Sequence, residues 1–125
     1  MAKYEFSDGW LLVSILYYKK GASLWNIIST GDMLNHSVFN LDELNSSINK
    51  LLANGYIEVI NNKYYATQKA KDFYIQNKKP DEGCISEMLR MSNMLMSMSC
   101  DKIDAFVTTS ENDYNHALGL LRKIL

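Results

Sequence analysis

The sequence predicts a mainly helical fold that includes one two-stranded β-hairpin. Apolar residues recur at helical spacing through most of the chain, as on one face of a helix. The exception is the stretch LLANGYIEVINNKYYATQKA, residues 51–70, where a glycine precedes two short runs rich in tyrosine, isoleucine and valine. With 125 residues, 47% of them apolar and 22% charged, the chain is long enough for one domain with its own core.

Two helices are expected first along the chain. The segment FSDGWLLVSILYYKKG predicts a helix that Ser7 caps and Gly21 stops. Its middle is apolar nearly all round, which is typical of a central, buried helix. The second helix is expected from about Leu24 to Leu34, behind a Ser23 cap.

The third expected helix, NLDELNSSINKLLANG, has the clearest pattern in the chain. Asn40 caps it, and Glu43 completes a capping-box pattern. The pair Asn54-Gly55 ends it, since glycine tolerates the left-handed conformation that closes many helices. Its apolar stripe consists of Leu41, Leu44, Ile48, Leu51 and Leu52.

The hairpin is expected next, with the runs YIEVI and KYYAT as its strands. They flank Asn61-Asn62, and asparagine accepts the positive φ angles of a two-residue turn. Thr67 is expected to cap a further helix, QKAKDFYIQNKK, whose end Pro80 marks.

The last part of the chain predicts two more helices. The segment ISEMLRMSNMLMSM is rich in methionine and is expected either to pack as core against the last helix or to form an adaptable binding surface. Ser110 is expected to cap the last helix. Its apolar stripe consists of Tyr114, Ala117, Leu118, Leu121 and Leu125.

The order of these elements resembles a winged helix-turn-helix domain of the MarR and PadR regulator type. The residues that carry the resemblance are INKLLANGYIEV, at 48–59, and NKYYATQKAKDFY, at 62–74. The resemblance implies a winged-helix domain at residues 7–79. Residues 80–125 then form a C-terminal helical extension that packs on this domain or forms a dimer interface. It also implies a small DNA-binding, transcription-regulator-like protein, with double-stranded DNA and a second copy of the chain as its partners.

Within this resemblance, the third helix is the one that enters the major groove of DNA. Its polar side chains supply candidate base and phosphate contacts, because asparagine pairs with adenine and lysine neutralises phosphate. The hairpin tip would contact the DNA backbone. The candidate nucleic-acid-binding residues are Asn45, Ser46, Asn49 and Lys50 in the helix, and Asn62 and Lys63 at the tip.

Two alternatives stay open. Asp42 and Glu43 begin the third helix, and carboxylates there repel phosphate. Together with a net charge of −1, they favour a winged-helix module that binds protein and not DNA. A ligand pocket between the winged-helix part and the C-terminal helices is the other alternative.

The sequence contains no pattern typical of a metal site, an enzyme or a membrane protein. Cys84, Cys100 and His116 do not match the spacing of a zinc site, so we expect no metal and no cofactor. The sequence has no nucleophile elbow and no glycine-rich phosphate loop, so we expect no enzyme. No apolar run is long enough for a membrane span, and the N-terminus does not read as a signal peptide, so we expect a cytoplasmic protein.

Overall fold

The computed structural model of the protein describes residues 3–100 and 107–124. This part of the chain is mainly helical and contains a two-stranded antiparallel hairpin, as the sequence predicts, in a winged-helix-like order. The elements are α1 (Phe6–Leu16), α2 (Leu24–Asn35), α3 (Leu41–Ala53), β1 (Ile57–Ile60), β2 (Lys63–Ala66), α4 (Gln68–Ile75), α5 (Cys84–Met96) and α6 (Glu111–Ile124). None of the helices described is long and apolar enough to cross a membrane.

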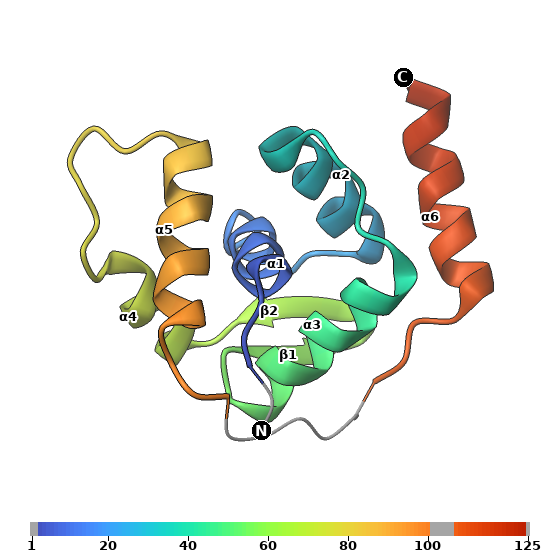
Figure 1. Ribbon diagram of the computed structural model, residues 1–125. Helices are drawn as coiled ribbons and strands as arrows, with labels where there is room; N and C mark the ends of the chain where they lie inside the picture. The colour runs from blue at the N-terminus through green and yellow to red at the C-terminus, as the bar shows by residue number, and fades with distance from the viewer. Residues whose placement is uncertain (1–2, 101–106, 125) are drawn as a thin grey trace.

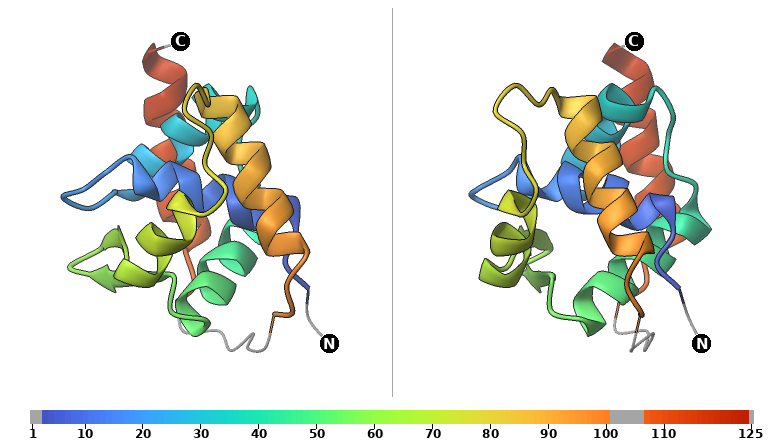
Figure 2. Two further views of the ribbon diagram at one scale, coloured as in Figure 1. Left: turned by 90° about the vertical axis from the view of Figure 1, so that its left-hand side faces the viewer. Right: turned by 60° about the vertical axis from the view of Figure 1, so that its left-hand side comes forward.

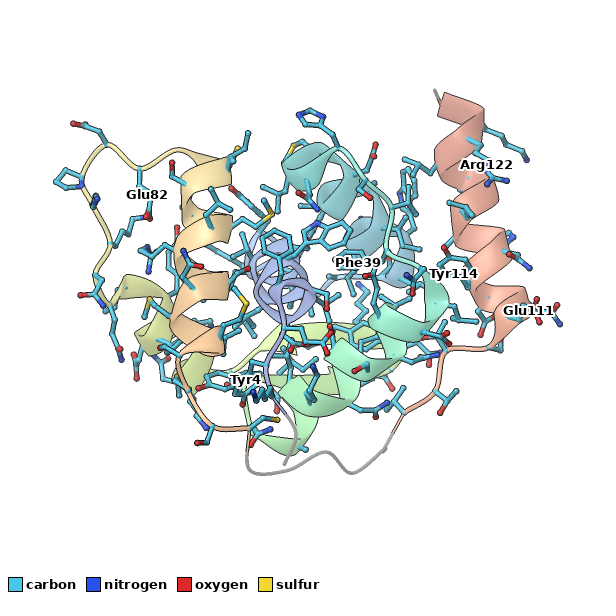
Figure 3. All side chains as sticks on the ribbon, viewed as in Figure 1. Tyr4, Phe39, Glu82, Glu111, Tyr114 and Arg122 are labelled. Carbon is cyan, nitrogen blue, oxygen red and sulfur yellow. The ribbon has the colours of Figure 1, made fainter. Side chains whose placement is uncertain are left out.

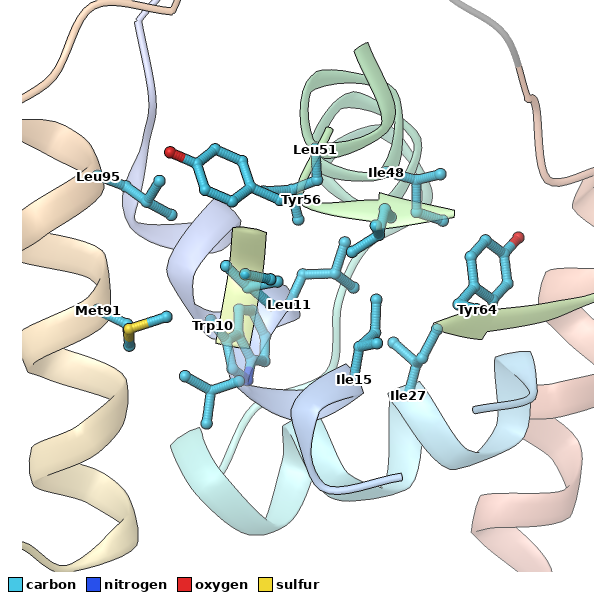
Figure 4. Packing of buried hydrophobic residues seen from close by; sticks show 14 of the residues in the cluster. Trp10, Leu11, Ile15, Ile27, Ile48, Leu51, Tyr56, Tyr64, Met91 and Leu95 are labelled. Carbon is cyan, nitrogen blue, oxygen red and sulfur yellow. The ribbon is translucent and has the colours of Figure 1, made fainter. Parts of the chain in front are cut away.

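Helix α1 lies at the centre of the molecule (Figure 1). It packs against α2, α3 and α5, and α6 lies outside α2 (Figures 1 and 2). Every residue of α1 from Ser7 to Ile15 is buried, as expected for the helix that is apolar on nearly every side. Figure 4 shows this core, in which Trp10, Leu11 and Ile15 meet side chains of the surrounding helices and of the hairpin.

The start of α1 differs from the expected one. Glu5, and not Ser7, is the N-cap, because the Asp8 carboxylate accepts a hydrogen bond from the Glu5 N–H at 2.7 Å. Ser7 lies inside the helix, where its hydroxyl accepts a hydrogen bond from Ser47 at 3.2 Å. The helix also ends well before Gly21, which lies in the loop to α2 with φ +96°.

The caps of α2 and α3 are the predicted ones. Ser23 and Asn26 exchange side-chain-to-backbone hydrogen bonds at the start of α2. Asn40 and Glu43 do the same at the start of α3, at 2.9 and 2.8 Å. Gly55, with φ +79°, follows Asn54 at the end of α3 and lets the chain turn into β1.

The hairpin turns at Asn61 and Asn62, with φ angles of 51° and 64°, as a two-residue turn of type I′ requires. Ala22, before α2, adds a short antiparallel bridge to Tyr64 of β2. Thr67 caps α4 as predicted. Helix α4 ends at Ile75, earlier than the expected end at Pro80, because Asn77 has a φ of 59° and turns the chain away.

The C-terminal helices bury apolar side chains within the chain, but α5 packs on α1 and not, as expected, against the last helix, which lies on the other side of the molecule (Figure 1). Met88, Met91 and Leu95 of α5 are buried in the main core, whereas Met96 and Met98 are exposed. Ser110 caps α6 as predicted, accepting a hydrogen bond from the Asp113 N–H at 3.1 Å. The apolar stripe of α6 forms a second cluster with α2, centred on Ile28, Ala117 and Leu121. Leu125, the last residue of the predicted stripe, lies outside the described residues.

Candidate functional site

The predicted DNA-facing surface of α3 is covered by a segment from the far end of the chain. We call residues 107–109 the C-terminal strap. Asn49 Oδ1 accepts from the Val107 N–H at 2.9 Å, and its Nδ2 donates to the Val107 carbonyl at 2.7 Å. Asn45 pairs with Thr109 in the same way, at 2.7 and 3.3 Å. Both predicted adenine readers thus have polypeptide backbone as their partner.

We call these four hydrogen bonds between the two asparagines and the strap the ladder. Its geometry follows from the repeat length of the helix and that of the extended chain. Residues four apart on a helix are separated by about 6 Å along its axis. Two residues of an extended chain span about 6.6 Å, so alternate residues of the strap match Asn45 and Asn49 in register. A carboxamide offers one acceptor and one N–H₂ donor group, so each can satisfy both backbone groups of one residue. The polar face of α3 is therefore shaped to hold an extended peptide.

Lys50 is also engaged inside the protein. Its ammonium lies 2.6 Å from the Asp8 carboxylate, and the two side chains are 7% and 0% exposed. It also donates to the Lys3 carbonyl at 3.2 Å. This buried ion pair joins the start of α1 to α3, so Lys50 does not face a solvent-accessible groove.

The other predicted contacts are exposed. Ser46 lies on the surface of α3, beside the exposed carboxylate of Asp42. Asn62 and Lys63 lie at the hairpin tip, where no described side-chain contact holds them. The structure thus brings Asn45 and Asn49 together under the strap and buries Lys50. Among the six candidates, Lys63 is the one cation that is exposed.

A second candidate site is a pocket of about 580 Å³ on another side of the molecule. Its lining comes from the end of α1, the loop that follows it, the hairpin and α4, and α5 contributes one residue. The left view of Figure 2 shows this loop, the hairpin and α4 on one side of the molecule. Four tyrosines give the pocket an aromatic lining. The lining residues are Val13, Leu16, Tyr17, Tyr18, Lys19, Glu58, Tyr65, Ala66, Lys71, Tyr74, Ile75 and Glu87.

Gly21 shapes one wall of this pocket. A Cβ atom added at Gly21 would lie 2.6 Å from the Tyr65 ring, so only glycine allows the loop to pack on that ring. Next to it, the Tyr18 hydroxyl is hydrogen-bonded to Thr30 of α2. These contacts hold two of the four tyrosines in place.

Glu87 of α5 forms the polar end of the pocket. Tyr74 donates a hydrogen bond to its Oε2, and the Lys78 ammonium lies 3.6 Å from the same oxygen. Burial raises the pKa of the Glu87 carboxyl, and the positive charge of Arg90 partly opposes that rise. The pKa of Tyr17 is raised as well, first by burial and then by the charges of Glu87 and Cys84.

No sequence pattern assigned a role to Glu87. Only its position in an otherwise apolar helix face could have drawn attention to it. Among the residues described, no group of three or more histidine, cysteine, aspartate or glutamate side chains could hold a metal ion. Comparisons with protein-family models, with curated proteins and with solved structures found no match to this chain.

Proposed function

We propose that this chain is a winged-helix interaction module that does not read DNA with α3 while the strap is in place. The observation that carries the proposal is the pairing of Asn45 and Asn49 with the backbone of Val107 and Thr109. In each asparagine, the carboxamide edge that would present a donor and an acceptor side by side to adenine is already paired with peptide backbone.

The charges on α3 support the same proposal. Lys50 is neutralised by Asp8, and the acidic residues Asp42 and Glu43 begin the helix. Neutralisation of phosphates supplies most of the affinity of a protein for DNA, and each lost cation removes one such contact. The face of α3 therefore has little with which to attract a duplex.

The test is fluorescence anisotropy of a labelled random-sequence duplex, titrated with the full chain at low and then at moderate salt. We expect no saturable binding at low salt, where phosphate contacts must show first. Saturable binding that weakens with salt, and weakens further in Ser46→Glu on the exposed side of α3, would refute the proposal. Ser86→Glu, which adds the same charge to an exposed position of α5, is the matched control.

The outer side of α5 supports a protein partner. Ile85, Leu89 and Met96 share one side of the helix and are 48%, 46% and 44% exposed. The inner stripes of α5 and α6 are used within the chain, so this outer stripe is where we place a dimer contact.

Sedimentation velocity of Leu89→Glu against wild type tests this dimer contact. We expect loss of the dimer in Leu89→Glu and its retention in Leu120→Glu, on the outer side of α6; a wild-type monomer at all concentrations would exclude the contact.

DNA binding is the second candidate function, favoured by the winged-helix-like order and by the exposed hairpin tip. It would require release of the strap from α3. In the double variant Asn45→Ala/Asn49→Ala the strap loses all four ladder hydrogen bonds. If the strap covers a functional DNA surface, that variant binds the duplex at low salt through its remaining cations, whereas wild type does not.

A further inference from the structure

The tyrosine-lined pocket has the size and the lining of a small-molecule site. Its volume of about 580 Å³ lies within the range of about 300–1,000 Å³ that is typical of such sites. Val13, Leu16 and Ile75 give it apolar walls, and the tyrosine rings add aromatic faces. A ligand with an apolar body therefore fits its walls.

The charged residues of the pocket differ in burial. Glu58, Lys19 and Lys71 are exposed, so their charges reach water at the rim. The Glu87 side chain is only 12% exposed, which makes it the most buried charge in the lining. The inner end of the pocket thus carries one buried carboxylate, whose charge Lys78 partly offsets from 3.6 Å, whereas the rim carries both signs.

Glu87 has acceptor capacity left for a ligand. Tyr74 and Lys78 both approach Oε2, and no hydrogen bond from a described residue reaches Oε1. The Lys78 ammonium is 3.6 Å away and 37% exposed, so water screens much of its charge. Arg90 is held by Glu82, at 2.7 Å from its Nε, and does not contact Glu87. A ligand that donates to Oε1 would therefore gain a buried, charge-assisted hydrogen bond.

We propose that this pocket binds a small organic cation, with an ammonium group at Glu87 and an apolar body against the tyrosine rings. Aromatic faces attract cations, and the attraction grows when water is excluded. Lys78 and Arg90 already lie over the Tyr74 ring, at 4.5 and 5.4 Å, so we place the ligand against the rings of Tyr17 and Tyr65. An anion would be repelled by the Glu87 carboxylate, and a neutral ligand could replace the lost hydration only with an uncharged, weaker donor. This inference does not depend on whether α3 contacts DNA.

The experiment compares three ligands of similar shape and different charge by NMR titration of the full chain. The probes are 2-phenylethylammonium, neutral 2-phenylethanol and anionic 3-phenylpropionate. We expect the ammonium to bind in the millimolar range, about tenfold more tightly than the other two. Its shifts should centre on the backbone amides around Tyr17, Tyr65 and Tyr74.

Two matched variants assign the preference to Glu87. Glu87→Gln keeps an acceptor for the Tyr74 hydroxyl but removes the charge, and should bind the three probes alike. Glu58→Gln removes an exposed rim carboxylate from the same pocket and should keep the preference. If Glu87→Gln does not fold, Glu58→Gln at falling pH replaces it, because it has no rim carboxylate at position 58. Only the ammonium and the alcohol are then compared, since the anionic probe would itself become protonated. Protonation of Glu87, which faces Tyr17, Tyr74, Cys84, Lys78 and Arg90, should then abolish the preference for the ammonium.

Several results would overturn the inference. These are equal binding of the three probes, tighter binding of the anion, or shifts that centre outside the pocket. Absence of binding by the ammonium in the millimolar range would do the same, as would an equal loss of preference in Glu58→Gln and Glu87→Gln.

Discussion

Replacing Gly9 with alanine would push apart the two helices that cross at this residue. Gly9 lies in α1 directly under α5, and a Cβ atom built there would lie 2.3 Å from Ser92 Oγ and 2.4 Å from Ser92 Cα. Two of the nearest atoms belong to the α5 backbone, which cannot rotate away as the end of a side chain can. The whole helix must therefore move.

The size of the effect follows from the distances. Carbon atoms in contact lie about 3.5 Å apart, so α5 must retreat by roughly 1 Å. That shift loosens the packing of Met91 and Leu95 on α1 and strains the hydrogen bond from Ser92 to the Phe6 carbonyl. Overpacking of this kind costs about 1–3 kcal/mol, and here we take the upper end. The higher helix propensity of alanine stabilises the fold by about 1 kcal/mol, so the free energy of unfolding should fall by about 2 kcal/mol in total.

Thermal unfolding followed by circular dichroism measures the loss. For a chain of this size, about 2 kcal/mol corresponds to a Tm lower by about 8 °C. Gly119→Ala is the control, since Gly119 also lies within a helix, but its added Cβ meets no atom of another described element within 4 Å. That change should raise the Tm by about 2–4 °C. If Gly9→Ala unfolds at or above the wild-type temperature while Gly119→Ala behaves as expected, the close crossing of α1 and α5 is wrong.

Three further predictions concern polar groups. Lys50→Ala leaves the Asp8 carboxylate buried without its cation and should cost about 3–5 kcal/mol in urea denaturation, whereas Lys63→Ala should cost almost nothing. The raised pKa of Glu87 means that its contribution to stability is complete below the unfolded-state pKa and is lost as pH rises through the folded-state pKa. Between a pH below the unfolded-state pKa and neutral pH, the Tm of wild type should therefore fall more than the Tm of Glu87→Gln. Parallel curves of Tm against pH would contradict this. Asn62→Gly should raise the Tm slightly, because φ is 64° there, while Asn62→Val should lower it.

Local chemistry explains which parts of the fold the sequence could predict. Ser23, Asn40 and Thr67 each satisfy a backbone N–H three residues on, so their roles depend only on neighbouring residues. The turn at Asn61 and Asn62 likewise depends on their own tolerance of positive φ. Such features can be identified without knowledge of the tertiary structure.

What covers the polar face of α3 could not be predicted in the same way. The helical pattern correctly separates its apolar stripe from Asn45, Asn49 and Lys50, but it does not say what covers them. Their partners lie far away in the chain, at residues 107 and 109 for the asparagines and at Asp8 for the lysine. The pocket has the same property, since four separate parts of the chain supply its tyrosines and Glu87.

The hydrogen bonds between α3 and the strap also affect the order in which parts of the protein fold and unfold. Its hydrogen bonds join residues 58 and 64 positions apart, and contacts of such long sequence separation form late. Beyond the strap, α6 packs mainly in the small cluster on α2, and Tyr114 also donates to the Phe39 carbonyl at the edge of the main core (Figure 3). We therefore expect the strap and α6 to dock last and to detach first, as one cooperative unit. The amide protons of Val107 and Thr109 would then exchange with deuterium well before those of α1.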